Sequence, residues 1–455
     1  MKLGKIVIAI AAAVAAGVPA VANVTAEEAR QLGTTLTEFG AIRAASADGR
    51  IPAYTGGFRG TPAGFQPDSG FWVDPFAADR PLYRITAANM AQHAHRLSAG
   101  QEALLRANPT TYYMDIYPSR RSVAFPEFFL RNTVRNATTC RIGPDNLSLQ
   151  GECAGGLPFP IPKTGYEVMW NHLLTFRGHN LITTSGSRSW VIDTRGRRTM
   201  TAEQATWIEM PFYQVALPDR DQSIKLRTHS FTTAPARMAG AMTGFADSID
   251  QVGVGRRAWT YTPGQRRIRL APEFAYDTPV ASQGGVTLFD ELFVFSGKMD
   301  RFTFRLVGQA EMYLPYNSYR SKFFCPPEQS MMARHANPEC ERWELHRVWV
   351  VEATLRPGMR HVYAKRRYYF DADQSGAALY DAWDQNGVLY RSIFNGMVQL
   401  YDKIQPHAVR TVIYDFNRGN WAYINDVSVG GIRVVPPLPN RQMVPEAVVA
   451  RETQR

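Results

Sequence analysis

The pattern of apolar and polar positions changes character near residue 187. Before that point, apolar residues recur at helical spacing in short segments. Thr25 with Glu28, and Ser98 with Gln101, have the spacing of capping boxes and mark two helix starts. The pattern predicts helices over residues 26–32, 86–97, 99–107, 126–136 and 166–176. The first third of the chain is therefore expected to be rich in short helices.

After residue 187 the pattern is that of extended strands, dense in Val, Ile, Thr and aromatic residues and divided by turn residues. Strands are predicted over residues 190–192, 207–212, 226–232, 256–262, 265–270, 288–295, 302–313, 347–355, 361–370, 389–393, 410–416 and 421–425. Pro263 and Gly264 predict a hairpin between two of them. Many strands without long helices between them favour one large antiparallel sheet, curled or barrel-like.

The first 22 residues have the order of a secretory signal. A start carrying Lys2 and Lys5 precedes an apolar run, and Pro19 precedes a small-residue ending that predicts cleavage after Ala22. An N-terminal membrane anchor is the alternative, but Pro19 and the shortness of the apolar run favour cleavage. No cysteine precedes Cys140, which excludes a lipid-modified N-terminus. We expect a soluble periplasmic protein with one domain over residues 23–435 and a Pro-rich, charged tail over residues 436–455.

Cysteine usage agrees with export. Cys140 with Cys153, and Cys325 with Cys340, each close a short loop, and their proximity in the sequence predicts two disulfides in an oxidising compartment. Four cysteines allow three pairings, and only proximity selects this one. A zinc site is the rival interpretation, but no two cysteines have the close spacing of a zinc-binding pair.

Composition narrows the class of partner. The net charge is +11, and 45% of the residues are hydrophobic, which is typical of a globular protein. The basic residues are scattered, and their densest clusters fall inside predicted strands, where solvated strand faces explain them. Export together with this distribution argues against nucleic acid as a partner.

A search for catalytic motifs finds no phosphate-binding loop, zinc-protease helix, nucleophile elbow or dinucleotide fingerprint. Glu167, Asn171 and His172 share a predicted helix and could form an acid–base site. A lone histidine beside Trp170 on a partly apolar helix favours a structural hydrogen-bonding role instead.

Three further carboxylates, Glu352, Asp371 and Asp373, lie on or near strands rich in arginine, so ion pairs explain them without catalysis. We therefore assign no catalytic residue, metal or cofactor, and the protein is not expected to be an enzyme.

The aromatic residues point to a ligand. They make up 12% of the chain, and a wide sheet with only short helices to cover it leaves room for a hydrophobic cavity. In the strand over residues 347–355, alternation places Trp349, Val351 and Ala353 on one face, which we expect to point inward, with Arg347 near a rim and Glu352 outward. These three and Trp170, which packs in the core or lines the cavity, are the candidate ligand contacts.

Six segments carry a family resemblance. They are residues 49–57 (GRIPAYTGG), 155–162 (GGLPFPIP), 167–178 (EVMWNHLLTFRG), 311–319 (EMYLPYNSY), 342–361 (RWELHRVWVVEATLRPGMRH) and 365–373 (KRRYYFDAD). Together they resemble the domain-of-unknown-function family 1329 of Gram-negative bacteria, whose members are commonly labelled outer-membrane lipoprotein-sorting proteins. The resemblance runs from residue 27 to residue 425.

The resemblance implies a fold similar to the lipoprotein carriers LolA and LolB, an unclosed antiparallel barrel whose apolar concave face is lidded by short helices and holds acyl chains. It also implies partnership with an inner-membrane exporter of the resistance-nodulation-division type and with an outer-membrane protein. The chain is longer than those carriers and lacks the lipidated cysteine of LolB, and the family brings no catalytic residues.

We therefore expect a periplasmic carrier or binding protein for a lipid or other amphiphile, acting between the inner and outer membranes. The alternative is an envelope assembly protein that binds polypeptide partners and carries nothing, and a third hypothesis is an enzyme acting on envelope lipid or glycan.

Overall fold

The computed structural model describes residues 24–454, apart from the side chains of residues 409 and 410, so the predicted signal segment lies outside the described residues. Sixteen of the strands form one sheet: β1 (Tyr83–Ile85), β2 (Met114–Tyr117), β5 (Leu181–Ile192), β6 (Arg198–Glu209), β7 (Ile224–Ala234), β8 (Met242–Ser248), β9 (Arg256–Thr262), β10 (Arg267–Leu270), β11 (Phe302–Pro315), β12 (Trp343–Leu355), β13 (Lys365–Asp371), β14 (Ala377–Trp383), β15 (Leu389–Leu400), β16 (Gln405–Asp415), β17 (Asn420–Asp426) and β18 (Ile432–Val435). A second, two-stranded sheet contains β3 (Cys140–Ile142) and β4 (Leu149–Gly151). The α-helices are α1 (Ala26–Ala29), α2 (Ala99–Ala107), α3 (Glu127–Thr139), α4 (Gly165–Leu173), α5 (Pro327–Ser330) and α6 (Pro445–Thr453).

The large sheet is open and mainly antiparallel. Its path runs β1-β2-β12-β13-β14-β15-β16-β17-β5-β6-β7-β8-β9-β10, with β11 on β12 and β18 on β5 as branches. Only the pairing of β2 with β12 is parallel among these ladders. The ends of the path do not pair with each other, so the sheet does not close into a barrel. The large unclosed sheet with short helices that the sequence predicts is confirmed.

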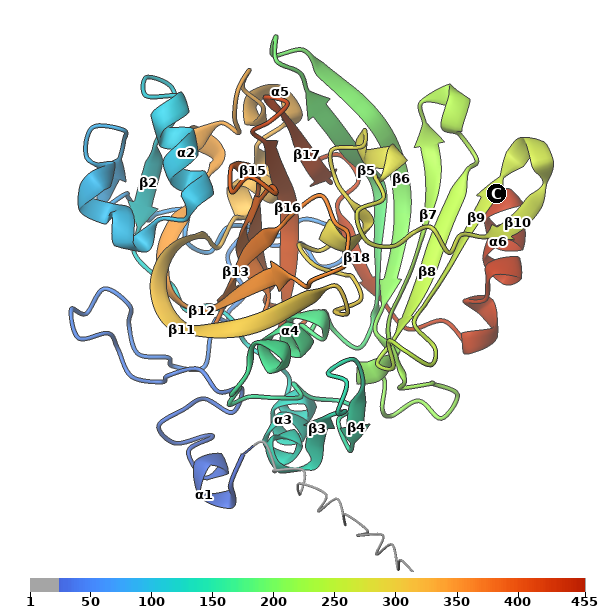
Figure 1. Ribbon diagram of the computed structural model, residues 1–455, viewed down its shortest axis with the longest axis horizontal. Coiled ribbons are helices and arrows are strands. Elements are labelled where there is room, and N and C mark those ends of the chain that lie inside the picture. Colours follow the sequence, from blue (N-terminus) through green and yellow to red (C-terminus); the bar gives the residue numbers. More distant parts are fainter. Residues whose placement is uncertain (1–23, 455) are drawn as a thin grey trace, which may run out of the picture.

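Two parts of the sheet are covered differently (Figure 1). Around β11–β15 the cover is helical, since α4 packs on β11 and β12 and α2 packs on β14 and β15. The approach is close, because a Cβ at Gly165 would lie 2.6 Å from the Phe304 carbonyl oxygen of β11. Trp170 of α4 is fully buried and donates its indole hydrogen bond to the Asn146 carbonyl oxygen at 3.1 Å. This part of the sheet therefore has a closed, packed core.

The part formed by β5–β10 spreads away from that core (Figure 1). One of its faces is covered by the C-terminal tail, which forms α6. Val448 of α6 packs with Met242, Trp259 and Tyr261, and Arg451 lies 3.2 Å from the His229 ring nitrogen. The Pro-rich tail is thus part of the packed structure. It does not cover the opposite face of these strands.

Most predicted elements are present, with differences that have local causes. Residues 288–295 are irregular rather than a strand: they contain the 3-10 turn η6 (Phe289–Glu291) and positive φ angles at Phe293 and Val294. The side chain of Glu291 is drawn into the interior, where it accepts hydrogen bonds from Arg391 and Tyr363. Residues 86–97 form the 3-10 helix η1 (Met90–Arg96) instead of an α-helix. The sequence pattern did not predict β1, β2, β3, β4, β8, β14 or β18. In β8 and β14, small and polar residues weaken the strand pattern.

Both predicted disulfides are present. Cys140 and Cys153 join the ends of the β3–β4 hairpin region, and Cys325 and Cys340 close the loop that contains α5. No helix within residues 24–454 combines the length and apolar character that crossing a bilayer requires.

Replacing Trp170 with Ala is expected to lower the free energy of unfolding by about 3–5 kcal/mol, because the indole is buried in the closed core and its loss leaves a cavity. Urea unfolding followed by circular dichroism measures this. Leu270→Ala is the matched control, since that side chain is 82% exposed and should change stability little. Equal stability of the two variants would contradict the placement of Trp170.

Candidate ligand-binding cavity

A cavity of about 320 Å³ lies on the face of the sheet that α6 leaves free. Its walls come from β5–β8 on one side, from β15–β17 on another, and from the loop over residues 274–293. This loop contains η6 and a second 3-10 turn, η5 (Ala281–Gln283), which packs on β5 and β6. The lid over this part of the sheet is therefore a loop and not a helix.

The sheet side of the cavity is lined largely by hydroxyl groups. Thr206 and Ile208 of β6 and Thr228, Ser230 and Thr232 of β7 line it at every second position, as one face of a strand does. The hydroxyls of Thr206 and Ser230 lie 3.3 Å apart. The floor can thus accept or donate hydrogen bonds without carrying charge.

The lid side is mainly apolar. Phe289, Leu292 and Phe293 line the cavity from the loop. The loop is held to the sheet by a hydrogen bond of 2.8 Å from the Thr201 hydroxyl to the Ser282 carbonyl oxygen. A ligand between lid and floor would meet apolar side chains on one side and hydroxyls on the other, which suits an amphiphile.

Basic side chains gather in the wall. Arg177 lines the cavity with its guanidinium 4.6 Å from the Phe293 ring centroid. Lys322 is buried and donates a hydrogen bond to the Asn425 carbonyl oxygen at 3.3 Å. Burial, together with the positive charges of Lys322 and Arg177, holds the pKa of the nearby His407 well below its usual value. The cavity is thus positively polarised.

Arg177 has no counterion among residues 24–454. Burial lowers the pKa of its guanidinium to about 10, and no carboxylate offsets that effect. Glu291 also lines the cavity, but its carboxylate is bound by Arg391 at 2.7 Å and by the Tyr363 hydroxyl at 2.7 Å. Glu291 therefore does not neutralise Arg177, and an anionic ligand group would.

The predicted ligand contacts lie elsewhere. Trp170, Val351 and Ala353 are fully buried in the core beneath the helices, and Trp349 is half-buried and packs against that core. None of the four lines the cavity. The physical reason is that α4 fills the space over β11 and β12, so the inward-facing residues of that strand meet protein.

The residues of the possible acid–base helix have structural roles. His172 accepts a hydrogen bond from the Ala377 backbone N–H through Nδ1, at 3.1 Å, and its Nε2 lies 3.0 Å from the Phe295 carbonyl oxygen. Glu167 closes a capping box with Thr164 at the start of α4, and Asn171 bonds the Phe159 backbone. The structural interpretation of this histidine is confirmed.

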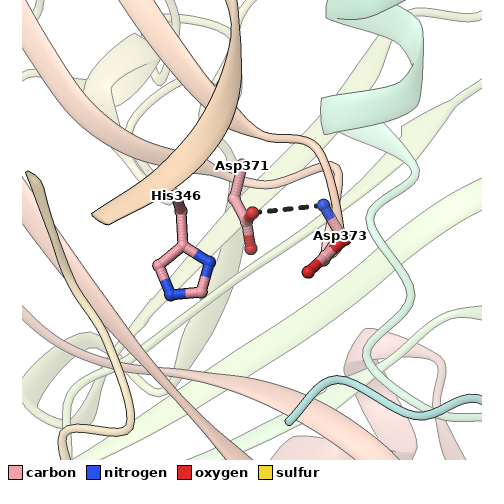
Figure 2. A group of neighbouring side chains, drawn as sticks. All are labelled: His346, Asp371 and Asp373. Atoms are coloured by element: carbon pink, nitrogen blue, oxygen red, sulfur yellow. Dashed lines mark hydrogen bonds between the residues drawn. The ribbon is translucent and has the colours of Figure 1, made fainter. Parts of the chain in front are cut away.

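A second buried polar group lies at the end of β13. His346, Asp371 and Asp373 offer one ligand atom each within 4.8 Å of one another (Figure 2). The ion-pair interpretation is correct for Asp373, which pairs with Arg121, and for Glu352, which pairs with arginines of neighbouring strands. It is wrong for Asp371, which forms no ion pair within residues 24–454 and whose pKa is raised to about 6 by burial and by the adjacent Asp373.

The sequence holds a weak signal for the cavity. Alternate positions of β6 and β7 are Thr, Ser or Gln over several residues. Such a face is neither a hydrophobic core nor a charged surface. Arg177, directly after an apolar helix, was the other signal. The loop that covers the cavity could not be predicted, because residues 288–295 have the composition of a strand.

The fold and the cavity define the class: a large, unclosed antiparallel sheet with a partly apolar internal cavity under a loop lid. The chain belongs to the family described as protein of unknown function (DUF1329), whose sequence model matches residues 84–435. It is 36% identical over 408 residues to the uncharacterized protein PA3922 of Pseudomonas aeruginosa, covering 88% of this chain and 87% of that protein.

Two solved structures are more distant. A putative outer membrane lipoprotein-sorting protein domain from Vibrio parahaemolyticus has a TM-score of 0.42 and 12% identity, covering 62% of this chain and 97% of its own. A DUF1329 family protein from Desulfovibrio piger has a TM-score of 0.42 and 11% identity, with the same coverage of 62% and 97%.

His172 should make stability depend on pH. Burial lowers its folded-state pKa to about 3, whereas the pKa of an unfolded histidine is about 6.5. The unfolded state thus binds the extra proton, and stability present above about pH 6.5 is lost as the pH falls toward 3. His172→Gln should reduce the slope of unfolding free energy against pH, between about pH 4 and 6, by up to about 1.4 kcal/mol per pH unit.

Urea unfolding at a series of pH values measures that slope. His95→Gln, which changes an exposed histidine, is the control and should leave the slope unchanged. An unaltered slope in the His172 variant would show that His172 is not held neutral.

Proposed function

We propose that the protein is a periplasmic binding or carrier protein for an amphiphile, and that it holds the amphiphile in the cavity between β5–β8 and the loop over residues 274–293. The observation that carries the proposal is the combination of an apolar lid, a hydroxyl floor and the unpaired Arg177 in one cavity.

The size of the cavity is adequate for this role. Its volume of about 320 Å³ falls at the lower end of the range of ligand sites, roughly 300–1,000 Å³. Burying a hydrocarbon chain against the lid would contribute about 0.8 kcal/mol per CH₂ group. Carriage of a chain of ordinary length would thus be tight and still reversible.

The charge in the cavity supports an anionic group on the amphiphile. A partly buried cation without a counterion is unfavourable, and a carboxylate or phosphate brought by the ligand would relieve the cost at Arg177. Lys322 adds positive charge to the same wall. An uncharged amphiphile would leave this cost in place.

Two features support a periplasmic location. The signal-like segment predicts export, and the two disulfides suit an oxidising compartment. The expected partners, an exporter of the inner membrane and an outer-membrane protein, remain predictions, as does transfer between the two membranes. The alternative, an envelope assembly protein that binds polypeptides, would make no use of the cavity.

Binding of a long-chain fatty acid and of the fatty alcohol of equal length tests the proposal. We expect the acid to bind more tightly by roughly 10–100-fold, because a charge-assisted hydrogen bond contributes about 1.5–3 kcal/mol. Arg177→Met should remove that preference while leaving the alcohol nearly unaffected. Displacement of a fluorescent fatty acid measures both affinities.

Arg269→Met is the matched control, because it removes the same charge from an exposed position of β10. It should change neither affinity. Failure of the wild-type protein to bind either compound, with no lipid found by mass spectrometry in protein purified from a Gram-negative periplasm, would refute the carrier function and favour the assembly function.

A bulky side chain on the floor should block the cavity. Ser230→Phe places a ring among the lining residues and is expected to abolish binding of both the acid and the alcohol. Thr233→Phe, at an exposed position three residues further along β7, should leave binding intact. Equal binding by both variants would mean that the ligand sits on the surface and not in the cavity.

A further inference from the structure

The group of His346, Asp371 and Asp373 lies away from the cavity, between β12 and the turn that follows β13 (Figure 2). All three residues are buried. In Figure 2, one ring nitrogen of His346 faces the two carboxylates and the other is turned away from them. The geometry thus brings a nitrogen and two carboxylate oxygens together in a dry interior.

A neighbouring carboxylate sets the tautomer of the histidine. His346 Nε2 lies 3.1 Å from an oxygen of Glu344, and the other oxygen of Glu344 accepts a hydrogen bond of 2.6 Å from Arg342. Glu344 is therefore an ionised acceptor, so Nε2 carries the hydrogen and Nδ1 presents its lone pair. A histidine that donates its second N–H to a carboxylate is the usual arrangement around a protein-bound metal ion.

The charges around the group do not balance. Asp373 is held by Arg121 through two hydrogen bonds of 2.6 and 2.9 Å. Asp371 accepts one hydrogen bond, from the Asp373 backbone N–H at 3.1 Å, but its second oxygen has no partner among the described residues. A buried carboxylate that faces a nitrogen lone pair, without a counterion, is strongly unfavourable.

A second unpartnered group is directed at the same place. The hydroxyl of Tyr316 is fully buried and forms no well-aligned hydrogen bond with any described residue. Its ring stacks on His346 with centroids 3.7 Å apart. The Tyr316 hydroxyl lies beside the Asp371 carboxylate, near enough for the two groups to interact directly.

We propose that His346 Nδ1, Asp371 and Asp373 bind a divalent metal cation, with the Tyr316 hydroxyl beside it. One nitrogen and two carboxylate oxygens form a ligand set that suits Zn²⁺ or Mn²⁺. The ion neutralises Asp371 and separates its charge from that of Asp373. Arg121 does not prevent this, since each carboxylate oxygen keeps a second lone pair for the metal.

The position of the site indicates a structural role. The turn after β13 also contacts the end of α4, where the Thr175 hydroxyl donates to the Ser375 carbonyl oxygen at 3.2 Å and the Ala377 N–H donates to His172 at 3.1 Å. A metal at the start of this turn would fix the turn, and with it the chain that leads from α4 to Arg177.

Metal binding by the intact, untagged protein tests the proposal. After treatment with EDTA and dialysis, the protein is titrated with Zn²⁺ and, separately, with Mn²⁺. We expect one equivalent of at least one of these ions to bind and to raise the melting temperature. Asp371→Asn and His346→Gln should lose this binding, and Glu344→Gln should weaken it about 10–100-fold, because Glu344 only orients the histidine.

His229→Gln is the control, since it changes an equally buried histidine on a different part of the sheet. It should bind the ion as the wild-type protein does. Absence of stoichiometric binding by the wild-type protein would overturn the proposal. So would unchanged binding in both Asp371→Asn and His346→Gln. The wild-type titration decides the question even where a variant does not fold.

Discussion

A sheet of sixteen strands must be covered along its whole length, and the chain has only short helices for the purpose. Where α4 and α2 reach the sheet, they pack on it directly and close the core. Beyond their reach, α6 covers one face of β7–β9, and the loop over residues 274–293 covers the other face of β5–β8. This loop does not fill the space over that face, and a cavity of about 320 Å³ remains.

Arg177 and Asp371 carry charges of opposite sign, form no ion pair with any described residue, and occupy different places. Arg177 lies in the wall of the cavity, and Asp371 lies in the dry group beside His346. Other interior charges form buried ion pairs, for example Arg391 with Glu291 and Asp415. An unpaired buried charge persists at a cost in stability, so each position is a natural place for a ligand of opposite charge.

Several of the segments that carry the family resemblance meet around Asp373. Arg121 joins this residue to the backbone of Pro52 in the segment over residues 49–57. The other segments there supply Tyr316, His346 and Asp373 itself. Chain regions more than 300 residues apart are thus tied together by buried polar contacts. Such contacts depend on precise geometry, because a buried polar group that loses its partner destabilises the fold.

The sequence by itself determined the short helices, most of the strands, the open antiparallel sheet and the two disulfides. These follow from local signals: α2 and its capping box depend on Ser98 and Gln101, and the β9–β10 hairpin depends on Pro263 and Gly264. The tertiary structure decided where the cavity lies, because that depends on what covers each face of the sheet. Trp349 and Val351 are residue types that often contact ligands, but α4 fills the space over their strand. The hydroxyl-rich face of β6 and β7 stays open. The meeting of His346 with Asp371 and Asp373 was likewise decided by the pairing of β12 with β13, which no local pattern specifies.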